Sequence, residues 1–251
     1  MIHQEIQDGI IIARMENGKV NALTTSFLNE LTEYFEKIDR DKAPALVISG
    51  SGNCFCAGVN LLEVFSPDQE NLSDFIDALN RCFKTLFMMK TPVVAAINGP
   101  ALAGGCIIVA CCDYKIASEE KTKIGITELK VGLPFPSIPL EIMKFILPKE
   151  KFQNVFYSAE IYSAVDALKL GLVDEVVPHY EVLAKAILKA KELAAIPQST
   201  FKLTKTKLRN ETTKLFISVD GLQYDEQVKN YWLSEECQRS VLQFMEKLKN
   251  K

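Results

Sequence analysis

Residues 93–112 read VVAAINGPALAGGCIIVACC, and this stretch decides which fold the rest of the chain is expected to adopt. Val93–Ile97 is a short uncharged run that ends in a turn signal, which is typical of a buried strand. Asn98-Gly99-Pro100 ends the strand, and the pair Gly104-Gly105 opens an apolar helix over Cys106–Cys112. A buried strand that leads into an apolar helix indicates a layered α/β domain.

The same alternation of strand and helix patterns extends to both sides of this stretch. Asp8-Gly9 between two strand-like runs predicts a hairpin, and Thr25 opens a series of apolar residues at helical spacing. The expected elements are a hairpin of Gln4–Gln7 and Ile10–Met15, a helix from Thr25 to Ile38, a strand at Ala45–Ile48, a helix from Phe75 to Phe87 and a strand at Tyr114–Ala117. Ser66–Asn71 is expected to be a mobile loop.

The chain beyond Pro148 is expected to be mostly helical, as a layer for packing and assembly. The helical patterns cover Lys151–Ser158, Ser163–Leu170, Glu181–Ala195, Ser199–Arg209, Leu215–Tyr231 and Ser234–Lys249. A length of 251 residues with 48% hydrophobic content is enough for one substantial core, so we expect one main domain.

Composition and charge limit the possible partners. A formal net charge of -3 and a pI near 5.6 give no global electrostatic reason to bind nucleic acid. The longest apolar stretch, residues 91–112, is interrupted by turn residues, so no membrane association is expected. Seven cysteines, an odd number, and an N-terminus without a basic-then-apolar signal region favour a reducing compartment, and we expect a bacterial cytoplasm.

Two glycine-bearing turns have the character of a site that binds an oxygen anion. In Cys56-Ala57-Gly58, small residues leave the N–H groups of Ala57 and Gly58 uncovered by bulky side chains. Gly104-Gly105 opens a helix whose first N–H groups have no intrahelical partner and whose dipole favours an anion. The alternatives are an ordinary strand-to-helix loop for the first turn and close packing of the helix on the preceding strand for the second.

Glu128 is the candidate acid/base. It lies in a mostly apolar segment, residues 124–132, where a carboxylate tends to have a raised pKa that suits a general base. The alternative is a surface glutamate paired with Lys130 or Lys123. Glu63 and Glu141 would supply a carboxylate only if the fold turned them inward, and exposed helical positions are expected for both.

The residues that the chain lacks also narrow the chemistry. There are only two histidines, His3 and His179, so a histidine-centred triad or a multi-histidine metal site is not expected. The cysteine spacings do not match zinc sites, and no metal is assigned. Neither GxGxxG nor GxxxxGK[ST] occurs, so the chain lacks both fingerprints of phosphate-binding loops.

Five motifs, in this order, resemble those of the crotonase (enoyl-CoA hydratase/isomerase) superfamily. They are Asn21-Ala22-Leu23, residues 55–61 (FCAGVNL), residues 97–106 (INGPALAGGC), Cys112-Asp113-Tyr114 and residues 167–174 (ALKLGLVD). The match spans nearly the whole chain. The ordered combination is specific for the superfamily and much less so for one reaction within it.

The resemblance implies an α/β fold, a crotonase-like spiral of ββα units with a C-terminal helical region. We expect the spiral core over residues 1–195, followed by residues 196–251 for packing and oligomerisation. Members of the superfamily usually assemble as trimers or pairs of trimers, so a homotrimer or hexamer is expected.

The resemblance also implies an acyl-CoA thioester substrate and no cofactor beyond the CoA that the substrate carries. Ala57 and Gly104 fall where the superfamily places the two N–H donors of its oxyanion hole, which hold the thioester oxygen as an enolate develops. The residues expected to bind substrate are Ala22, Gly58, Val59, Asn60, Leu61 and Gly105.

The expected reaction is a double-bond shift. The hydratases of the superfamily use two glutamates, and this chain has Ile107 at the first of these positions, where isoleucine neither activates water nor delivers a proton. Isomerisation of 3-enoyl-CoA to trans-2-enoyl-CoA needs one base, Glu128, to move a proton from C2 to C4. Residues 103–107, 112–116 and 196–205 resemble those of mitochondrial-type Δ3,Δ2-enoyl-CoA isomerases, although no transit peptide is evident.

Other readings stay open. On the same scaffold the chain would be a divergent hydratase or a CoA-thioester hydrolase or decarboxylase, and outside enzymes it would be a catalytically silent acyl-CoA-binding or assembly protein. Two departures from the common pattern bear on the acyl pocket. Asn60 stands where the superfamily often has Asp, and Leu133-Pro134-Phe135-Pro136-Ser137 replaces a glycine-rich stretch common in hydratases.

Overall fold

A computed structural model of the chain describes residues 1–65 and 72–249, so the loop expected at Ser66–Asn71 lies outside the described residues. The main sheet has the strand order β1-β2-β3-β4-β6-β9. These strands are β1 (Ile2–Gln7), β2 (Ile10–Met15), β3 (Leu46–Gly50), β4 (Val93–Ile97), β6 (Tyr114–Ser118) and β9 (Glu175–Val177). The pair β1-β2 is antiparallel, and every other neighbouring pair in this sheet is parallel.

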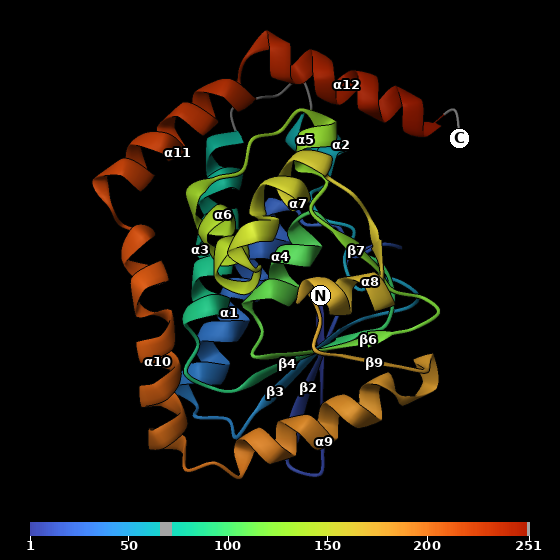
Figure 1. Cartoon of the computed structure of the whole chain (residues 1–251), viewed down its shortest axis with the longest axis vertical. Coiled ribbons are helices and arrows are strands. Elements are labelled where there is room, and N and C mark those ends of the chain that lie inside the picture. Colours follow the sequence, from blue (N-terminus) through green and yellow to red (C-terminus); the bar gives the residue numbers. More distant parts are fainter. Residues whose placement is uncertain (66–71, 250–251) are drawn as a thin grey trace.

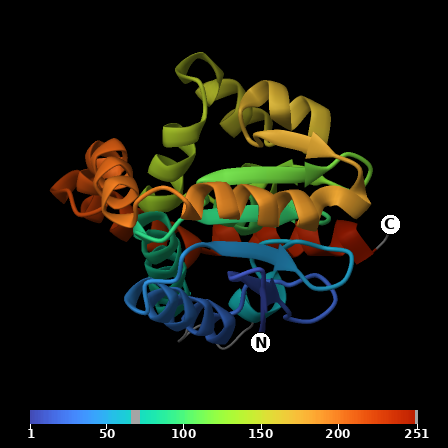
Figure 2. The ribbon, with the colours of Figure 1, turned by 90° about the horizontal axis from the view of Figure 1, so that it is seen from below.

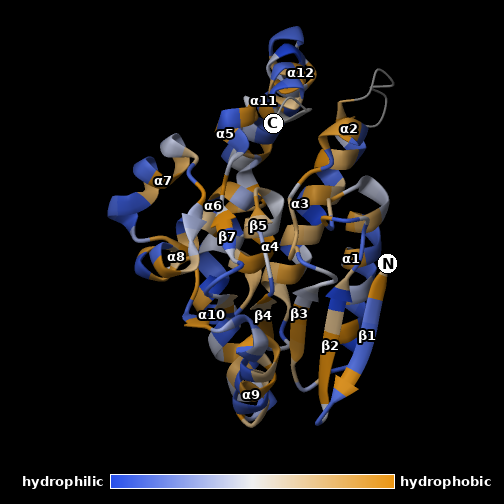
Figure 3. Ribbon diagram, turned by 90° about the vertical axis from the view of Figure 1, so that its right-hand side faces the viewer, coloured by the Kyte–Doolittle hydropathy of each residue, from blue (hydrophilic) through white to orange (hydrophobic). Residues whose placement is uncertain are grey.

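The sheet carries apolar side chains on both faces, which explains the uninterrupted apolar runs of its central strands. Alternate residues of β4 belong to two different cores: Val93 and Ala95 to the larger one, Val94 and Ala96 to the smaller one. Helices α1 (Thr25–Arg40), α3 (Leu72–Met88) and α4 (Gly104–Cys111) supply the larger core. Helix α9 (Val182–Ala194) covers the other face (Figure 2), and Figure 3 shows the hydrophobic colouring of β2, β3 and β4.

A small second sheet brings two distant segments together. It has the order β5-β7-β8, with β5 (Ala101–Leu102), β7 (Lys123–Gly125) and β8 (Tyr162–Ser163). Leu102 is paired in parallel with Gly125. Because parallel strands end at the same edge of a sheet, the residues that follow β5 and those that follow β7 emerge side by side.

The remaining helices surround this frame. They are α2 (Leu61–Val64), α5 (Glu128–Val131), α6 (Ser137–Ile146), α7 (Phe152–Ser158), α8 (Ala164–Leu170), α10 (Gln198–Leu215), α11 (Val219–Trp232) and α12 (Glu235–Lys249), with single 3-10 turns at Lys149–Lys151 and His179–Glu181. Figure 1 shows α10, α11 and α12 following the outside of the molecule, with α12 on the side of α5 and α2. Within the described residues, no helix combines the length and the apolar character that crossing a bilayer requires.

Most of the predicted elements are confirmed, but the helix α6 and several short elements, among them α2, β5, β8 and β9, were not predicted. The hairpin and the strand Val93–Ile97 are present, and six helices follow Pro148. The strand β9 was not predicted because three residues are too few to show a period. The helix α6 was not predicted either, because Pro139 within its first turn reads as a turn signal when the sequence is taken alone.

A buried ion network fastens α10 to the core. Asp113 accepts hydrogen bonds from Lys205 Nζ at 2.6 Å, from Arg209 Nη2 at 2.8 Å and from the backbone N–H of Val93 at 2.8 Å. Arg209 also donates to the carbonyl of Cys111 at 3.1 Å. Burial lowers the pKa of Lys205, and the charge of Asp113 opposes that shift.

Replacing Asp113 by Ala is expected to destabilise the protein strongly, because it leaves two buried cations without their counter-charge. Losing one partner of a buried pair costs about 3–5 kcal/mol, which urea unfolding would register as a lower midpoint. Glu211→Ala on the same helix removes only exposed contacts, the ion pair with Lys214 and a hydrogen bond from Asn210 Nδ2, and serves as the control. Equal midpoints for the two variants would contradict a stabilising role for Asp113.

Candidate active site

The two glycine turns and Glu128 meet at one edge of the small sheet. Strand β5 leads through Ala103 into the N-terminus of α4, and β7 leads within three residues to Glu128, the first residue of α5. The turn that contains Ala57 joins them, because Cys56 forms a parallel bridge with Ala101. Backbone pairing therefore sets the relative positions of the three segments.

The turn at residues 57–60 is held by a short parallel pairing with residues 20–23. The N–H of Leu23 donates to the carbonyl of Gly58 at 2.8 Å, and the N–H of Asn60 donates to the carbonyl of Leu23 at 2.9 Å. The N–H of Ala57 donates to the carbonyl of Val20 at 3.0 Å. The predicted oxyanion donor Ala57 is therefore already engaged. Among the described residues the N–H of Val59 has no such partner.

Asn21 fixes the start of this turn. Its side chain is fully buried, its φ is +51°, and its Nδ2 donates to the carbonyl of Cys54 at 2.8 Å and to that of Ser51 at 3.2 Å. Asparagine tolerates the left-handed region better than most residues, and its side-chain amide replaces missing backbone partners. The motif Asn21-Ala22-Leu23 thus has a structural role in shaping the turn.

Glycines allow the two turns to touch. A Cβ on Gly58 would lie 2.7 Å from Ala103 Cβ and 3.2 Å from the backbone nitrogen of Gly104. A Cβ on Gly105 would lie 2.1 Å from the carbonyl oxygen of Cys56. No other residue fits these positions without moving the backbone. Both glycines were expected to bind substrate, which stays a prediction, and the contacts show that they join the two turns.

The second turn presents free N–H groups. Ala103 precedes α4 with φ +50° and ψ -125°, a strained conformation for a residue with a side chain. The N–H groups of Gly104 and Gly105 open the helix and have no intrahelical partner. Strain of this kind persists only where the surroundings enforce it. Here the N–H of Ala103 is held by the carbonyl of Gly125 at 2.8 Å.

Glu128 is buried in an apolar setting. Only 9% of its surface is exposed, and its Oε2 has no hydrogen-bond partner in the part of the chain that the structure describes. Burial raises the pKa of Glu128 to about 8, against the opposing effect of the backbone N–H groups of Glu128 and Thr127. Cys106 lies close enough that the charge of Glu128 adds to the effect of burial in raising the pKa of the Cys106 thiol.

These residues line one cavity of about 700 Å³. Of the predicted site residues, it contains Ala22, Ala57, Val59, Asn60, Leu61, Gly104 and Glu128. Gly58 and Gly105 lie outside its lining. The other two carboxylates considered are also outside: Glu63 accepts a hydrogen bond from the N–H of Thr25 at 3.0 Å, and Glu141 pairs with Lys144 at 2.7 Å.

Apolar side chains form most of the cavity wall. Ile107 of α4 takes part in it, as do Leu79 and Phe83 of α3 and Leu133 and Phe135 between α5 and α6. Trp232, Phe244 and Met245 come from the C-terminal helices. These three were not predicted from the sequence, because their place in the wall depends on where α11 and α12 lie in three dimensions.

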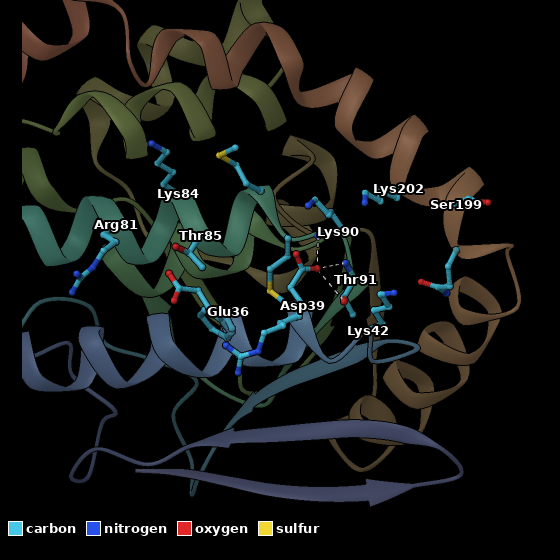
Figure 4. Close-up of a pocket in the computed structure, with 15 residues that line it drawn as sticks. Glu36, Asp39, Lys42, Arg81, Lys84, Thr85, Lys90, Thr91, Ser199 and Lys202 are labelled. Carbon is cyan, nitrogen blue, oxygen red and sulfur yellow. Dashed lines mark hydrogen bonds between the residues drawn. The ribbon is translucent and has the colours of Figure 1, made fainter.

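A second hollow is larger, about 950 Å³, and lies between α1, α3 and α10 (Figure 4). Its cationic residues are Arg40, Lys42, Arg81, Lys84, Lys90 and Lys202, and its carboxylates are Glu36 and Asp39. Asp39 accepts hydrogen bonds from the backbone N–H groups of Lys90 at 2.7 Å and Thr91 at 2.8 Å. No predicted site residue lies here, so the smaller cavity around Glu128 is the candidate active site.

Comparison with known proteins identifies the family. The family model described as enoyl-CoA hydratase/isomerase matches residues 5–251. The chain belongs to this family. The predicted resemblance to the crotonase superfamily is confirmed, and the family acts on acyl-CoA substrates.

Individual relatives agree with this assignment. Over 257 residues the chain is 30% identical to the mitochondrial enoyl-CoA delta isomerase 1 of Mus musculus, which covers 100% of this chain and 88% of that protein. The structure of human mitochondrial delta3-delta2-enoyl-CoA isomerase matches with a TM-score of 0.93 and 24% identity, covering 99% of this chain and 98% of that one, and this likeness confirms the fold class. A probable enoyl-CoA hydratase from Mycobacterium tuberculosis matches with a TM-score of 0.84 and 28% identity, covering 93% and 99% of the two chains.

The expected cytoplasmic location is wrong by the same comparison. The matching enoyl-CoA delta isomerases of mouse, rat and human are all named as mitochondrial proteins, and this finding contradicts the expectation. Unpaired cysteines indicate a reducing compartment, but they do not indicate which reducing compartment it is.

Gly58→Ala is expected to lower turnover of an enoyl-CoA substrate at least about tenfold, since the added methyl group pushes against the wall that carries Gly104. Gly52→Ala is the matched control. Gly52 also has a positive φ, +69°, so alanine meets similar backbone strain, but no heavy atom lies within 4 Å of the added Cβ. Equal activity of the two variants would show that close contact of the turns is not needed.

Proposed function

We propose that the protein is a Δ3,Δ2-enoyl-CoA isomerase that converts 3-enoyl-CoA to trans-2-enoyl-CoA. One observation carries the proposal: among the described residues that line the cavity, Glu128 is the one carboxylate, and Ile107 stands on α4 nearby. A double-bond shift needs one group that both accepts and returns a proton. A single buried carboxylate suits that requirement.

The proposed mechanism has two proton transfers. Ionised Glu128 removes a proton from C2, the C2–H bond breaks, and the electron pair spreads over the thioester as a dienolate. Glu128 then returns the proton to C4, which leaves the double bond between C2 and C3. The carboxylate is regenerated, so the chain itself is unchanged over one cycle.

The negative charge on the thioester oxygen needs hydrogen-bond donors. The N–H of Gly104 is one, at the N-terminus of α4, where the helix dipole adds to its effect. The resemblance to the superfamily implied Ala57 as the second donor, but its N–H already donates to the carbonyl of Val20. We therefore assign the second donor to Val59, which lines the cavity and whose N–H has no backbone partner within residues 1–65 and 72–249.

Hydration is the weaker alternative. Adding water across a double bond requires one group to activate the water and another to deliver a proton. Ile107 does neither, and Thr127 and Lys130 are the only other cavity residues with a hydroxyl or amino side chain among those described. A thioester hydrolase or decarboxylase and a silent acyl-CoA-binding protein are further alternatives, and the assay below separates them.

The same proposal covers the cofactor and the assembly. The proton shift needs no cofactor beyond the CoA of the substrate. A homotrimer or hexamer is supported by large exposed apolar side chains on α10, on α11 and between them, at Leu203, Leu208, Leu215, Ile217, Val219 and Leu222.

Purified protein is expected to convert trans-3-hexenoyl-CoA to the conjugated 2-enoyl thioester, which is followed by its ultraviolet absorbance. Glu128→Gln is expected to lower the rate by about 10²–10⁴ while acyl-CoA binding persists, since only the base is lost. Glu141→Gln, outside the cavity, is the control. Crotonyl-CoA hydration or release of free CoA without conjugation would overturn the isomerase assignment, and binding without any turnover would favour a silent protein.

The rate is expected to rise with pH through the pKa of Glu128. Burial raises that pKa to about 8, so at pH 6 most of the base is protonated and inactive. A plot of kcat/KM against pH should therefore climb to a plateau above pH 8. A plateau already reached at pH 6 would mean that the carboxylate is not desolvated in the free enzyme.

A further inference from the structure

The segment Gly132–Ser137 joins the helix that carries Glu128 to α6, and the C-terminal helices hold it. Gly132 ends α5 with φ +88°, and the N–H of Leu133 donates to the carbonyl of Glu128 at 3.0 Å. Leu133, Phe135 and Pro136 line the cavity. Any shift of this segment would move both the backbone of Glu128 and the acyl wall.

Trp232, near the end of α11, makes the first attachment. Its indole Nε1 donates to the carbonyl of Pro134 at 3.1 Å, and only 2% of the residue is exposed. Its ring packs against Phe65 beyond α2, with centroids 6.0 Å apart. Trp232, which lines the cavity itself, thus connects the segment with Phe65.

Asp225, two turns earlier on α11, makes the second attachment. Its carboxylate accepts the N–H of Ser137 at 2.6 Å and the hydroxyl of Ser137 at 2.7 Å, and Asp225 is 8% exposed. Ser137 is the first residue of α6, and Pro136 before it provides no side-chain cap. Asp225 therefore caps α6 from another helix, where a negative charge also suits the dipole.

Helix α12 makes the third contact. Cys237 Sγ lies 3.7 Å from the carbonyl oxygen of Gly132 as a weak donor, and a Cβ on Gly132 would lie 2.8 Å from Ser240 Cβ. Figure 1 shows α12 on the side of α5. The end of the Glu128 helix is therefore covered directly by α12.

We propose that Asp225 and Trp232 are positioning residues for Glu128, acting through the segment Gly132–Ser137. The inference rests on the proposed function, in which Glu128 is the base. It assigns a role in turnover to the C-terminal helices, because they hold the backbone to which the reacting carboxylate is attached. Catalysis is sensitive to such placement, and a misplacement of about 1 Å can cost about 10²-fold in rate.

The test compares Asp225→Ala, Asp225→Asn and Trp232→Phe with the wild type on trans-3-hexenoyl-CoA, well below each melting temperature. Asp225→Ala and Trp232→Phe are expected to lower kcat about tenfold or more, with KM changed less than about twofold. Asp225→Asn should recover most of the rate, since its amide can accept from the Ser137 N–H and donate to the Ser137 hydroxyl. Gln223→Ala, at an exposed position of α11, is the control.

A second readout does not depend on activity. Trp232 is the one tryptophan of the chain, so its fluorescence reports on this attachment alone. Acrylamide should quench it weakly in the wild type and in Asp225→Asn, and more strongly in Asp225→Ala. A variant that melts at a lower temperature but keeps kcat and its quenching would overturn the positioning role and leave a structural one.

The two proposals fail in different ways. A wild type that does not conjugate trans-3-hexenoyl-CoA overturns the proposed function. The attachment is then judged by the quenching of Trp232, and unchanged quenching in Asp225→Ala overturns it too. A normal wild-type rate with unchanged kcat in both Asp225→Ala and Trp232→Phe overturns only the positioning role.

Discussion

The rest of the structure depends on close contacts between backbone segments at glycine residues, where there is no side chain in the way. At four described glycines the nearest carbonyl oxygen leaves the least space for a side chain: a Cβ would lie 2.0 Å from Cys54 O at Gly50, 2.1 Å from Asn53 O at Gly99, 2.1 Å from Cys56 O at Gly105 and 2.2 Å from Glu160 O at Gly125. The contact of Gly50 with Cys54 closes one loop, and the other three join segments that lie far apart in the chain. Because these contacts stack the segments, backbone N–H groups from distant parts of the sequence share one cavity.

Burying the charged carboxylate of Glu128 lowers the stability of the folded protein. A carboxylate without a hydrogen-bond partner is expensive to bury in its charged form, and the rise of its pKa to about 8 expresses that cost. Protonation at lower pH relieves it, so the group contributes less to stability as the pH rises toward 8. The same desolvation makes the ionised group a stronger base. The apolar surroundings, which include Ile107 and Cys106, therefore favour the proposed chemistry but lower the stability of the fold.

The sequence predicted the parts of this molecule that depend on short-range patterns. Val93–Ile97 and the Asp8-Gly9 hairpin were recognisable because apolar runs and turn residues act locally. The cavity was partly predictable for the same reason, since the pair Gly104-Gly105 follows the apolar strand Val93–Ile97 closely and Glu128 lies in a mostly apolar segment. The hydrogen bond from the N–H of Ala57 to the carbonyl of Val20 was not predictable, because the two residues lie 37 positions apart and a backbone carbonyl is the same in every residue. The contributions of Trp232, Phe244 and Met245 escaped prediction because tertiary contacts alone bring α11 and α12 to the site.

The C-terminal helices are attached to the rest of the protein in two places. One attachment stabilises the fold, and the other lies beside the candidate active site. The buried network of Asp113 with Lys205 and Arg209 anchors α10 to the core away from the cavity, where it contacts none of the residues proposed to act on substrate. Asp225 and Trp232 lie further along, beyond the turn into α11, and reach the segment that follows Glu128. The network of Asp113 holds α10 against the core. Helix α11 therefore starts close to the cavity, and the hydrogen bonds of Asp225 and Trp232 are enough to hold the cavity wall. In addition to the packing and assembly role predicted for residues 196–251, the C-terminal helices therefore supply the last wall of the candidate active site.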